Sequence, residues 1–255
     1  MITTAVKTHK ITTTDKDILR ILDRYMPRLA EGSIVAIASK IVAITEGRLV
    51  KKTSETQKDE LAAKEAEYYL PREENKYGFL ITVKHNLLVA SAGIDESNGN
   101  GYLVLWPKDP QKSANMIREY LVKKHKVKRV GVIITDSKLT PLRWGVTGYA
   151  LASSGFRVLN SYIGKPDIFG RLMHAEKLNV ADSLAAATVA VTGEGSEQTP
   201  IAIIEDLPSV VFQKRNPTNK EIKELHISLT DDVFYPLLKA VKWRVRVQRP
   251  EEEKK

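Results

Sequence analysis

Short runs of β-branched and aliphatic residues alternate along this chain with stretches whose apolar residues recur every three or four positions. Such runs are typical of buried strands, and the recurrent spacing is typical of helices that bury one face. The predicted strands are 33–45, 129–135, 200–205 and a pair within 77–92. The predicted helices are 15–26, 57–70, 110–124, 170–190 and 230–241. Strands and helices mixed in this order indicate an α/β or α+β fold, and the pattern marks no clean boundary between domains.

The predicted helix over 110–124 has a recognisable signal at each end. Asp109 precedes Pro110, and proline is favoured at the first position of a helix. A basic run from Lys123 to Arg129 follows the last apolar residues of the helix. Cations near the carboxyl end of a helix complement its dipole. We therefore interpret this run as a solvated helix end rather than as a surface for nucleic acid.

Composition limits the classes of protein to which this chain can belong. Its 255 residues suffice to bury an apolar core, and they include no cysteine. Disulfide scaffolds, zinc–cysteine sites, iron–sulfur clusters and cysteine nucleophiles are thereby excluded. No apolar stretch reaches the ~18–20 residues that cross a bilayer, and the amino-terminal residues lack the features of a secretory signal. We therefore expect a soluble cytoplasmic protein without a membrane partner.

The net charge of +9 also bears on possible partners. Outside 123–129 the basic residues are spread along the chain, and aromatic residues make up only 7% of it. Nucleic-acid interfaces concentrate cations on one face together with aromatic side chains for stacking, so a nucleic-acid partner is not expected. A diffusely positive surface suits small polyanionic substrates such as nucleotides.

Several common catalytic signatures are missing from the sequence. It contains no Gly-x-x-x-x-Gly-Lys, Gly-x-Gly-x-x-Gly or His-Glu-x-x-His segment, and its five histidines are scattered without metal-ligand spacing. Three acidic segments remain, at 92–101, 135–138 and 192–199. Their oxygen-bearing side chains are of the kind that Mg²⁺ and Mn²⁺ prefer, namely Asp95, Asp136, Ser137 and Glu194. Segments that combine Asp or Asn with Gly are also common as plain turns, so the residues alone leave both interpretations open.

Seven short segments occur in a characteristic order along the chain. They lie at 39–48, 90–98, 132–137, 141–145, 162–171, 180–185 and 193–195. In this order they resemble the coenzyme F420-0:L-glutamate ligase family, the γ-glutamyl ligases that add glutamate to a deazaflavin precursor. The resemblance extends from about residue 10 to residue 207, which is most of the chain.

The resemblance implies a site for two metal ions and a nucleotide. Asp95 and Asp136 would bind the first metal ion, while Ser137, where the family usually has threonine, would serve the second together with Glu194. The nucleotide would be contacted by Lys10, Ile11, Thr12, Thr13, Ser39, Lys40, Asn98, Thr192, Gly193, Gly195, Ser196, Glu197, Gln198 and Thr199. We expect Asp95, Asp136 and Arg143 to act in catalysis. Arg143 could hold a substrate carboxylate or phosphate by a bidentate contact, although a surface ion pair would explain it equally well.

The resemblance also implies the fold, the reaction and the partners. The family has an α+β fold of two interleaved sub-domains and forms an intertwined dimer. Residues 1–247 are therefore expected to form one such unit, and the charged residues 248–255 a disordered tail. The implied substrates are L-glutamate, a deazaflavin acceptor and GTP or ATP, with Mg²⁺ or Mn²⁺ at two sites. The acceptor carboxylate would become an acyl phosphate, from which the glutamate amine displaces phosphate.

Two positions depart from the family pattern. Ile44 stands where the family has a lysine that contacts the nucleotide, and Thr140 stands where an arginine is usual. The metal-binding positions are kept, so the pattern predicts ligase chemistry with an altered choice of acceptor or nucleotide. A folate γ-glutamyl ligase with the same chemistry is the first alternative. The second is a non-catalytic nucleotide- or RNA-binding protein on the same scaffold, which the two substitutions and the basic charge would favour.

Overall fold

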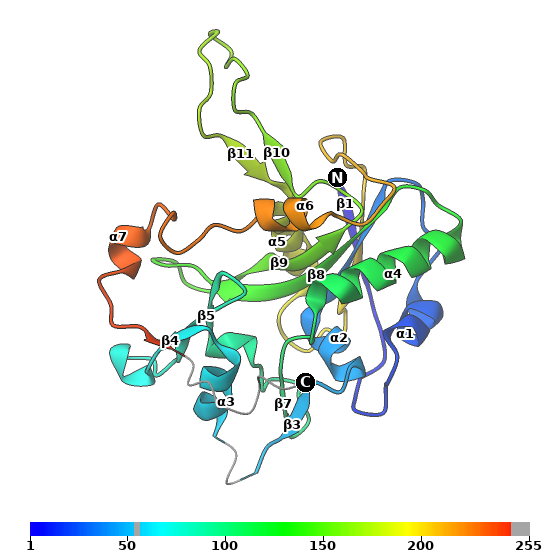
Figure 1. The fold of residues 1–255 in the computed structure, drawn as a ribbon. Coiled ribbons are helices and arrows are strands. Elements are labelled where there is room, and N and C mark those ends of the chain that lie inside the picture. Colours follow the sequence, from blue (N-terminus) through cyan, green and yellow to red (C-terminus); the bar gives the residue numbers. More distant parts are fainter. Residues whose placement is uncertain (54–56, 246–255) are drawn as a thin grey trace. The chain divides into compact units, whose positions relative to one another are not determined.

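A computed structural model describes residues 1–53 and 57–245 and shows an α+β fold (Figure 1), which confirms the expected fold class. The chain divides into two compact units, and each unit is formed from two separate stretches of sequence. Unit 1 comprises Met1–Arg48 and Pro107–Leu225, and unit 2 comprises Leu49–Trp106 and the described residues from His226 onward. The predicted tail, 248–255, lies outside the described residues.

Unit 1 is built around a five-stranded sheet with the strand order β1-β12-β2-β8-β9. Its strands are β1 (Ile2–Val6), β2 (Ser33–Ala38), β8 (Val130–Leu139), β9 (Val146–Ser154) and β12 (Ile201–Glu205). β2 and β8 run parallel, whereas the other neighbouring strands are antiparallel. The predicted strand at 200–205 is confirmed by β12, which lies between β1 and β2.

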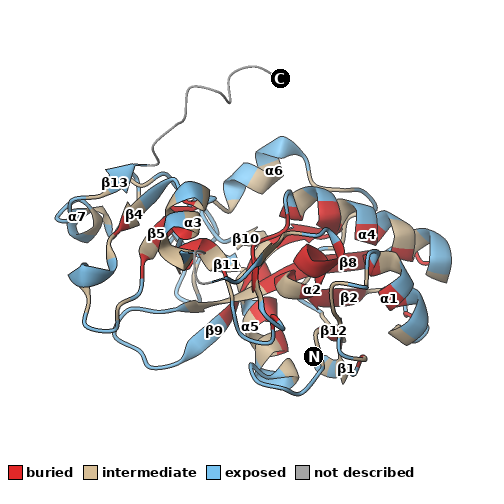
Figure 2. Cartoon of the chain, turned by 90° about the horizontal axis from the view of Figure 1, so that it is seen from below, coloured by how far each residue is buried: buried red, intermediate tan, exposed pale blue. Residues whose placement is uncertain are grey.

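Helices cover both faces of this sheet (Figure 2). The helices of unit 1 are α1 (Ile18–Tyr25), α2 (Ser39–Thr45), α4 (Pro110–His125), α5 (Val180–Thr192) and α6 (Asn219–Glu224). Val35 and Ile37 pack with residues of α1 and α4, whereas Ile34 and Ala36 pack with residues of α5. Because both faces of β2 are buried, the strand is apolar at successive positions instead of alternating.

The apolar segment 33–45 was predicted to be one strand. In the structure it is β2 followed directly by helix α2. Ser39 is buried, and so is every residue from Ile41 to Thr45. A helix that is buried on nearly all sides carries no polar stripe. Periodicity therefore cannot distinguish it from a buried strand, which is why the prediction was wrong.

Strand β8 is longer than the predicted strand at 129–135. It continues to Leu139 because β9 pairs with it antiparallel along this extension, after a shift in register between Ile134 and Thr135. Asp136 and Ser137 therefore lie within a strand and not in a loop that follows one. Their backbone positions are set by hydrogen bonds to β9.

Helix α4 confirms the predicted helix at 110–124. The Asp109 side chain accepts a hydrogen bond from the backbone N–H of Lys112 at 2.9 Å, and Pro110 is the first helical residue. The basic run after this helix is exposed except at His125, which is half-buried, and Val127, which is buried. It therefore ends a helix at the surface, as the sequence analysis predicts.

The remaining predicted helices are shorter in the structure. α1 begins at Ile18, where Asp17 caps it by accepting a hydrogen bond from the N–H of Leu19. α5 begins at Val180 rather than at 170, with Asn179 as its cap. The predicted helices at 57–70 and 230–241 contain only α3 (Lys58–Glu65) and α7 (Tyr235–Leu238). In each case neighbouring strands or turns take the rest of the segment.

Residues 159–179 form a hairpin that projects from unit 1 (Figure 1), and we call it the arm. β10 (Leu159–Ser161) and β11 (Lys177–Asn179) pair at its base. At its tip Ile168 is 92% exposed and Phe169 is 89% exposed. The Asp167 carboxylate accepts hydrogen bonds from the backbone N–H groups of Phe169 and Arg171, both at 2.9 Å, so this apolar tip has a defined turn.

Unit 2 contains two small antiparallel sheets, with the strand orders β13-β4-β5-β6 and β3-β7. Their strands are β3 (Leu49–Lys51), β4 (Tyr68–Leu70), β5 (Ile81–Lys84), β6 (Leu87–Ala90), β7 (Tyr102–Val104) and β13 (Arg244–Val245). β5 and β6 confirm the pair of strands predicted within 77–92. His85 and Asn86 join them with φ values of 51° and 57°, as a two-residue hairpin turn requires. No helix within the described residues is long and apolar enough to cross a membrane.

Candidate functional site

Most of the predicted site residues in unit 1 follow one edge of its sheet. The register aligns Val6, at the end of β1, with Ile201, at the start of β12. Ile201 pairs in turn with Ile37 of β2, and the next residue of β2, Ala38, pairs with Thr135 of β8. The chain segments that continue from these positions are 7–13, 192–200, 39–40 and 136–137. They therefore meet at this edge, which we call the site edge.

Backbone hydrogen bonds fasten these segments to one another. The N–H of Thr8 donates to the carbonyl of Gln198 at 2.8 Å, and the N–H of Ala38 donates to the carbonyl of Pro200 at 2.9 Å. Thr199 closes the loop 192–199 by donating from its hydroxyl to the carbonyl of Thr192. The structure thus brings together three segments that are far apart in the sequence, and these hold most of the residues predicted to contact a nucleotide.

The segment Lys10–Thr13 is held by side chains on either side of it. Asp15 accepts a hydrogen bond from the N–H of Thr12 at 2.8 Å, and its other oxygen lies 2.9 Å from Nε2 of His9. Nδ1 of His9 lies 2.8 Å from the hydroxyl of Tyr25. His9 is therefore a histidine with two partners, and it orients the start of the predicted nucleotide-binding segment.

The loop 192–199 is shaped by Glu197 and its glycines. The N–H of Gly195 donates to Oε2 of Glu197 at 2.8 Å. A Cβ at Gly193 would lie 2.5 Å from Cδ of Glu197, and the φ of Gly193 is +76°. Glycine is therefore required at Gly193, because a larger residue would displace the carboxylate and strain the backbone. Glu194 lies between the two glycines and Ser196 follows them, and both residues are exposed.

Asp136 and Ser137 are half-buried in β8 beside the site edge. The Asp136 carboxylate accepts a hydrogen bond from the N–H of Ser137 at 2.9 Å. Side chains of successive strand residues point to opposite faces of a sheet. The register therefore puts the Asp136 carboxylate and the Ser137 hydroxyl on opposite faces, which the sequence analysis did not anticipate.

Asp95 and Asn98 belong to unit 2. The backbone of Asp95 pairs with Val104 through two hydrogen bonds, of 2.9 and 2.8 Å. The Asp95 carboxylate accepts hydrogen bonds from the N–H and the hydroxyl of Ser97, at 2.8 and 2.9 Å. Asn98 follows in the left-handed conformation, with a φ of 54°. The plain-turn interpretation thus describes the local geometry of this segment, and a ligand role for Asp95 stays a prediction.

Arg143 lies in the turn that joins β8 to β9, and it is exposed. Its backbone N–H donates to the carbonyl of Thr140 at 3.2 Å. Within the described part of the chain its side chain forms no ion pair, so the alternative of a surface ion pair gains no support. Thr140 is also exposed, whereas Ile44, a residue of α2, is 5% exposed. The position at which the resemblance implies a nucleotide-binding lysine is therefore buried here.

The predicted metal ligands have the chemistry that suits a divalent cation. In unit 1 Asp136 and Glu194 offer carboxylate oxygens, which Mg²⁺ and Mn²⁺ prefer, and in unit 2 Asp95 does the same. Over residues 1–53 and 57–245, no three His, Asp or Glu side chains converge closely enough to hold a metal ion. A cation here would therefore complete its coordination with substrate phosphates and water, as Mg²⁺ commonly does. A further sign of an incomplete polar site is Tyr149, the residue opposite Asp136 in β9, whose buried hydroxyl has no hydrogen-bond partner among the described residues.

Neither Tyr149 nor Lys138 was predicted as a site residue, although Tyr149 lies opposite Asp136 and Lys138 lies two residues further along β8. No element was predicted for 146–154, which forms β9. Had β8 been extended to Leu139, a hairpin closing at 140–145 would have aligned Tyr149 with Asp136. Tyr149 was missed because the end of β8 could not be predicted. Periodicity alone does not fix where a strand ends.

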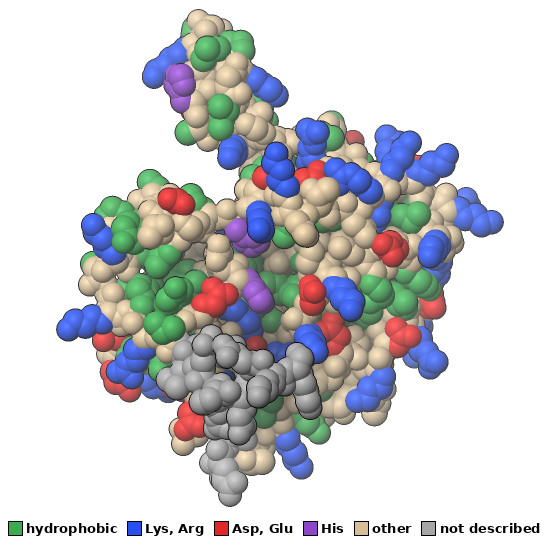
Figure 3. Space-filling model, viewed as in Figure 1, with side chains coloured by type: hydrophobic (Ala, Val, Ile, Leu, Met, Phe, Trp, Pro, Cys, Tyr) green, Lys and Arg blue, Asp and Glu red, His purple; other side chains and the backbone are tan. Residues whose placement is uncertain are grey.

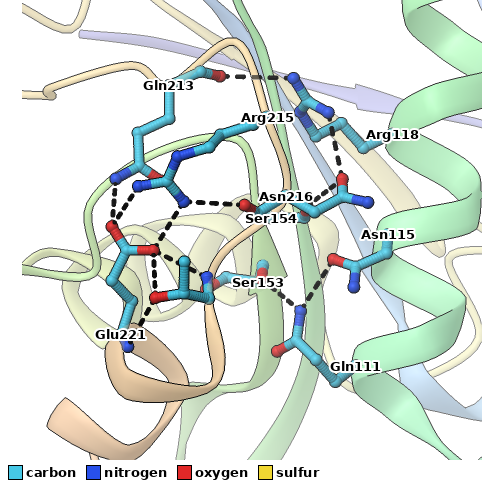
Figure 4. Close-up of polar contacts among 10 residues, drawn as sticks. Gln111, Asn115, Arg118, Ser153, Ser154, Gln213, Arg215, Asn216 and Glu221 are labelled. Atoms are coloured by element: carbon cyan, nitrogen blue, oxygen red, sulfur yellow. Dashed lines mark hydrogen bonds and ion pairs between the residues drawn. The ribbon is translucent and has the colours of Figure 1, made fainter.

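A second polar cluster in unit 1 has a structural role (Figure 4). Arg118 of α4 is 4% exposed, and its Nη1 donates to Oδ1 of Asn216 at 3.1 Å. The same oxygen accepts from the hydroxyl of Ser154, and the Asn216 amide donates to Glu119 at 2.6 Å. Glu221 of α6 forms two ion-pair hydrogen bonds with Arg215, at 2.7 and 2.9 Å. The cluster fastens residues 213–221 to α4 and to the end of β9.

Unit 2 contains a hollow of about 710 Å³ that involves none of the predicted site residues. Its described lining is Glu65, Ala66, Glu67, Tyr68, Lys84, His85 and Val245. Lys84 is 5% exposed and donates to Glu65 at 2.7 Å. Burial lowers the pKa of His85, and the charge of Lys84 lowers it further. The hollow is thus lined by a buried lysine paired with a half-buried glutamate and by a histidine that favours its neutral form.

The surface charge is dispersed. On the face that Figure 3 shows, Lys and Arg side chains are scattered among acidic and uncharged ones and form no continuous patch. Several of the basic residues are paired, including Lys124 with Asp23 and Arg129 with Glu31. That nucleic acid is not the partner stays a prediction.

Comparison with known proteins gives a consistent result. The family model described as F420-0:Gamma-glutamyl ligase matches residues 1–206. A protein of Methanopyrus kandleri named Coenzyme F420:L-glutamate ligase is 36% identical over 226 residues, covering 81% of this chain and 86% of the relative. The protein of that name from Methanococcus maripaludis is 35% identical over 220 residues, with the same two coverages. A third, from Methanocaldococcus jannaschii, is 36% identical over 193 residues and covers 74% of this chain and 75% of the relative.

Proposed function

The chain belongs to the F420-0:gamma-glutamyl ligase family, and from this membership we propose that it forms an amide between L-glutamate and a carboxylate of coenzyme F420-0. The observation that carries the proposal is the match of the family model over residues 1–206, together with relatives named Coenzyme F420:L-glutamate ligase. The meeting of the predicted substrate segments at the site edge supports it.

The proposed reaction uses GTP, or ATP in its place, to activate the acceptor. A carboxylate does not condense with an amine at neutral pH, because its oxygen is a poor leaving group. In the first step an oxygen of the acceptor carboxylate attacks the γ-phosphorus, and the nucleoside diphosphate leaves. In the second step the amine nitrogen of L-glutamate attacks the acyl carbon and phosphate leaves with the bonding electrons. Loss of a proton from nitrogen completes the amide.

The residues of the site edge would bind and orient the nucleotide. These residues come from segments that hydrogen bonds fasten to one another. They are Lys10, Ile11, Thr12, Thr13, Ser39, Lys40 and those of the loop 192–199. Gly193, with a φ of +76°, lets the loop turn beside this edge. Asn98 of unit 2 would add a further nucleotide contact. Arg143, exposed in the β8–β9 turn, would hold a carboxylate or phosphate of a substrate.

Asp136, Glu194 and Asp95 would hold Mg²⁺ or Mn²⁺ at two sites. When bound, divalent cations neutralise charge on the triphosphate and align the phosphoryl group that is transferred. Because Ser137 points to the sheet face opposite that of Asp136, we expect its hydroxyl to contribute less than the carboxylates do. Ile44 removes one positive charge that the family provides, so the other cations of the site edge would carry the binding of phosphate.

The active form is proposed to be a homodimer. The tip of the arm exposes Ile168 and Phe169 almost completely, and exposed apolar residues of this size mark interaction surfaces. The turn that presents them is held by Asp167, so the tip does not need to be ordered by a partner. A second copy of the chain is the partner that the family resemblance implies.

The experiment that tests the function is a ligation assay read by mass spectrometry. Purified protein is incubated with L-glutamate, F420-0, GTP or ATP, and Mg²⁺ plus Mn²⁺, with parallel reactions that lack nucleotide or contain a chelator. We expect a product heavier by one glutamate residue only in the complete reaction. A reduced folate replaces F420-0 in a parallel arm. Glutamylation of folate alone would contradict the proposed acceptor, and nucleotide binding without any product would contradict the ligase activity.

A further inference from the structure

Tyr149 of β9 lies directly opposite Asp136 of β8 in the antiparallel register. Side chains of residues that face each other across an antiparallel pair lie on the same face of the sheet, with their Cβ atoms roughly 5 Å apart. The Tyr149 ring is therefore a neighbour of the Asp136 carboxylate. Lys138, two residues further along β8, lies on this face as well, and its Nζ is 5.3 Å from the centroid of the Tyr149 ring.

The Tyr149 hydroxyl is buried without compensation. The residue is 0% exposed, and its Oη forms no hydrogen bond with the described part of the chain. Burial of a hydroxyl without a partner is unfavourable, because the group gives up its hydrogen bonds to water. A phenylalanine would fill the same space at no such cost. The hydroxyl therefore indicates a partner that is engaged only in another state of the site.

Two carboxylates act electrostatically on the Tyr149 hydroxyl, those of Asp136 and Asp182. The phenol hydroxyl can donate one hydrogen bond to such a group. Asp182 already accepts hydrogen bonds from the N–H of Ala150 and from the amide of Asn179, both at 2.9 Å, and these hold it at the start of α5. Asp136 is the carboxylate that lies across the strand pair from Tyr149.

We propose that Tyr149 is a positioning residue for Asp136: when a divalent cation is bound, the Tyr149 hydroxyl donates to the Asp136 carboxylate and fixes its orientation. This inference rests on the proposed role of Asp136 as a metal ligand. Carboxylates that bind metals are themselves hydrogen-bonded, and loss of such an outer partner typically weakens metal affinity by about 10- to 100-fold. The Lys138 ammonium group lies over the same ring, where a cation–π interaction favours it.

The test is the affinity of the full-length protein for Mn²⁺, measured by calorimetry and by electron paramagnetic resonance with GDP present, because the cation would complete its coordination with phosphate oxygens. We expect Tyr149→Phe to weaken Mn²⁺ binding by about tenfold or more. The same change should leave the metal-free protein at least as resistant to thermal unfolding as the unmodified protein, because it removes an unpaired hydroxyl from the interior. These two results together distinguish a positioning role from a purely structural one. If Tyr149 had a purely structural role, Tyr149→Phe would lower the thermal stability of the metal-free protein.

Tyr120→Phe is the matched control. Tyr120 is also in unit 1, and its hydroxyl is hydrogen-bonded to Asp23, away from the site edge. This variant should lose thermal stability and keep its Mn²⁺ affinity. Equal Mn²⁺ affinities of Tyr149→Phe and the unmodified protein would overturn the inference while leaving the proposed function intact, as would an equal loss in both variants. Failure of the unmodified protein to bind Mn²⁺ would instead contradict the metal role of Asp136, and the inference with it.

Discussion

Arg118 of α4 donates a hydrogen bond to Asn216, 98 positions further along the chain, over a distance of 3.1 Å. Arg118 is almost completely buried, and its Nε has no hydrogen-bond partner within the described residues. Burial lowers the pKa of the guanidinium. Burying a cation costs free energy unless acceptors replace its hydrogen bonds to water. The hydrogen bond to Asn216 therefore offsets part of the cost of burying Arg118.

Asn216→Ala is expected to destabilise unit 1. The change removes an acceptor from Arg118 and from the Ser154 hydroxyl, and it removes the amide that donates to Glu119. We expect the free energy of unfolding to fall by about 1–3 kcal/mol, as measured by urea denaturation. Lys220→Ala, at an exposed position of α6, serves as the control and should change it by less than about 0.5 kcal/mol. Equal effects of the two variants would show that the cluster contributes no stability.

Glu221 should make part of the stability depend on pH. Its ion-pair hydrogen bonds with Arg215 lower the pKa of the Glu221 carboxyl well below its usual value, and the N–H of Thr218 lowers it further. A carboxylate whose pKa is depressed by folding stabilises the protein above its unfolded pKa of 4.5 and loses this contribution as the pH falls towards the folded value. We therefore expect the stability difference between the unmodified protein and Glu221→Gln to shrink between about pH 6 and about pH 3. A difference that stays constant over this range would contradict the assignment.

Asp136→Asn is expected to abolish ligation while the protein stays folded. The amide keeps the shape of the side chain but removes the charge that would hold a divalent cation, so we expect turnover to fall by at least about 100-fold. Circular dichroism and thermal unfolding check that the fold is retained. Asp206→Asn, an exposed carboxylate paired with the amino terminus, is the matched control and should keep full activity. Retained turnover in Asp136→Asn would exclude Asp136 as a metal ligand.

Phe169→Glu is expected to weaken the proposed dimer. A charge at the arm tip cannot be buried against a second copy without a large desolvation cost, so the dimer dissociation constant should rise by at least about tenfold. Light scattering coupled to gel filtration measures this over a range of protein concentrations. Lys165→Glu, on the same arm, controls for the change in charge alone. A monomeric unmodified protein, or a dimer that Phe169→Glu leaves unaltered, would argue against the arm as the contact.

Local patterns in the sequence determined many elements of this fold. Asp109 and Pro110 mark the start of α4 because a cap and a fixed φ act within one turn of helix. β12 and the pair β5 and β6 were likewise predicted, since a short apolar run between turn signals carries enough information to indicate a strand. The ordered segments that resemble the ligase family also lie in the sequence itself, and the family match confirms the family that they indicated.

Tertiary structure decided the elements whose signals depend on distant partners. Whether 39–45 is strand or helix was settled by burial on all sides, which erases the periodicity that distinguishes the two. The length of β8 was settled by pairing with β9, and that pairing moved Asp136 from a loop into a strand.

Part of the candidate site could likewise be predicted from the sequence, and part of it depends on the tertiary structure. The residue types of Asp95, Asp136 and Glu194 suggested a metal–nucleotide site from the sequence alone. The site edge, by contrast, exists because the strand order β1-β12-β2-β8 sets four remote segments side by side. The unpaired hydroxyl of Tyr149 is visible only once β9 is aligned with β8. Propensity and capping act over a few residues, whereas strand order, register and burial are properties of the whole folded chain.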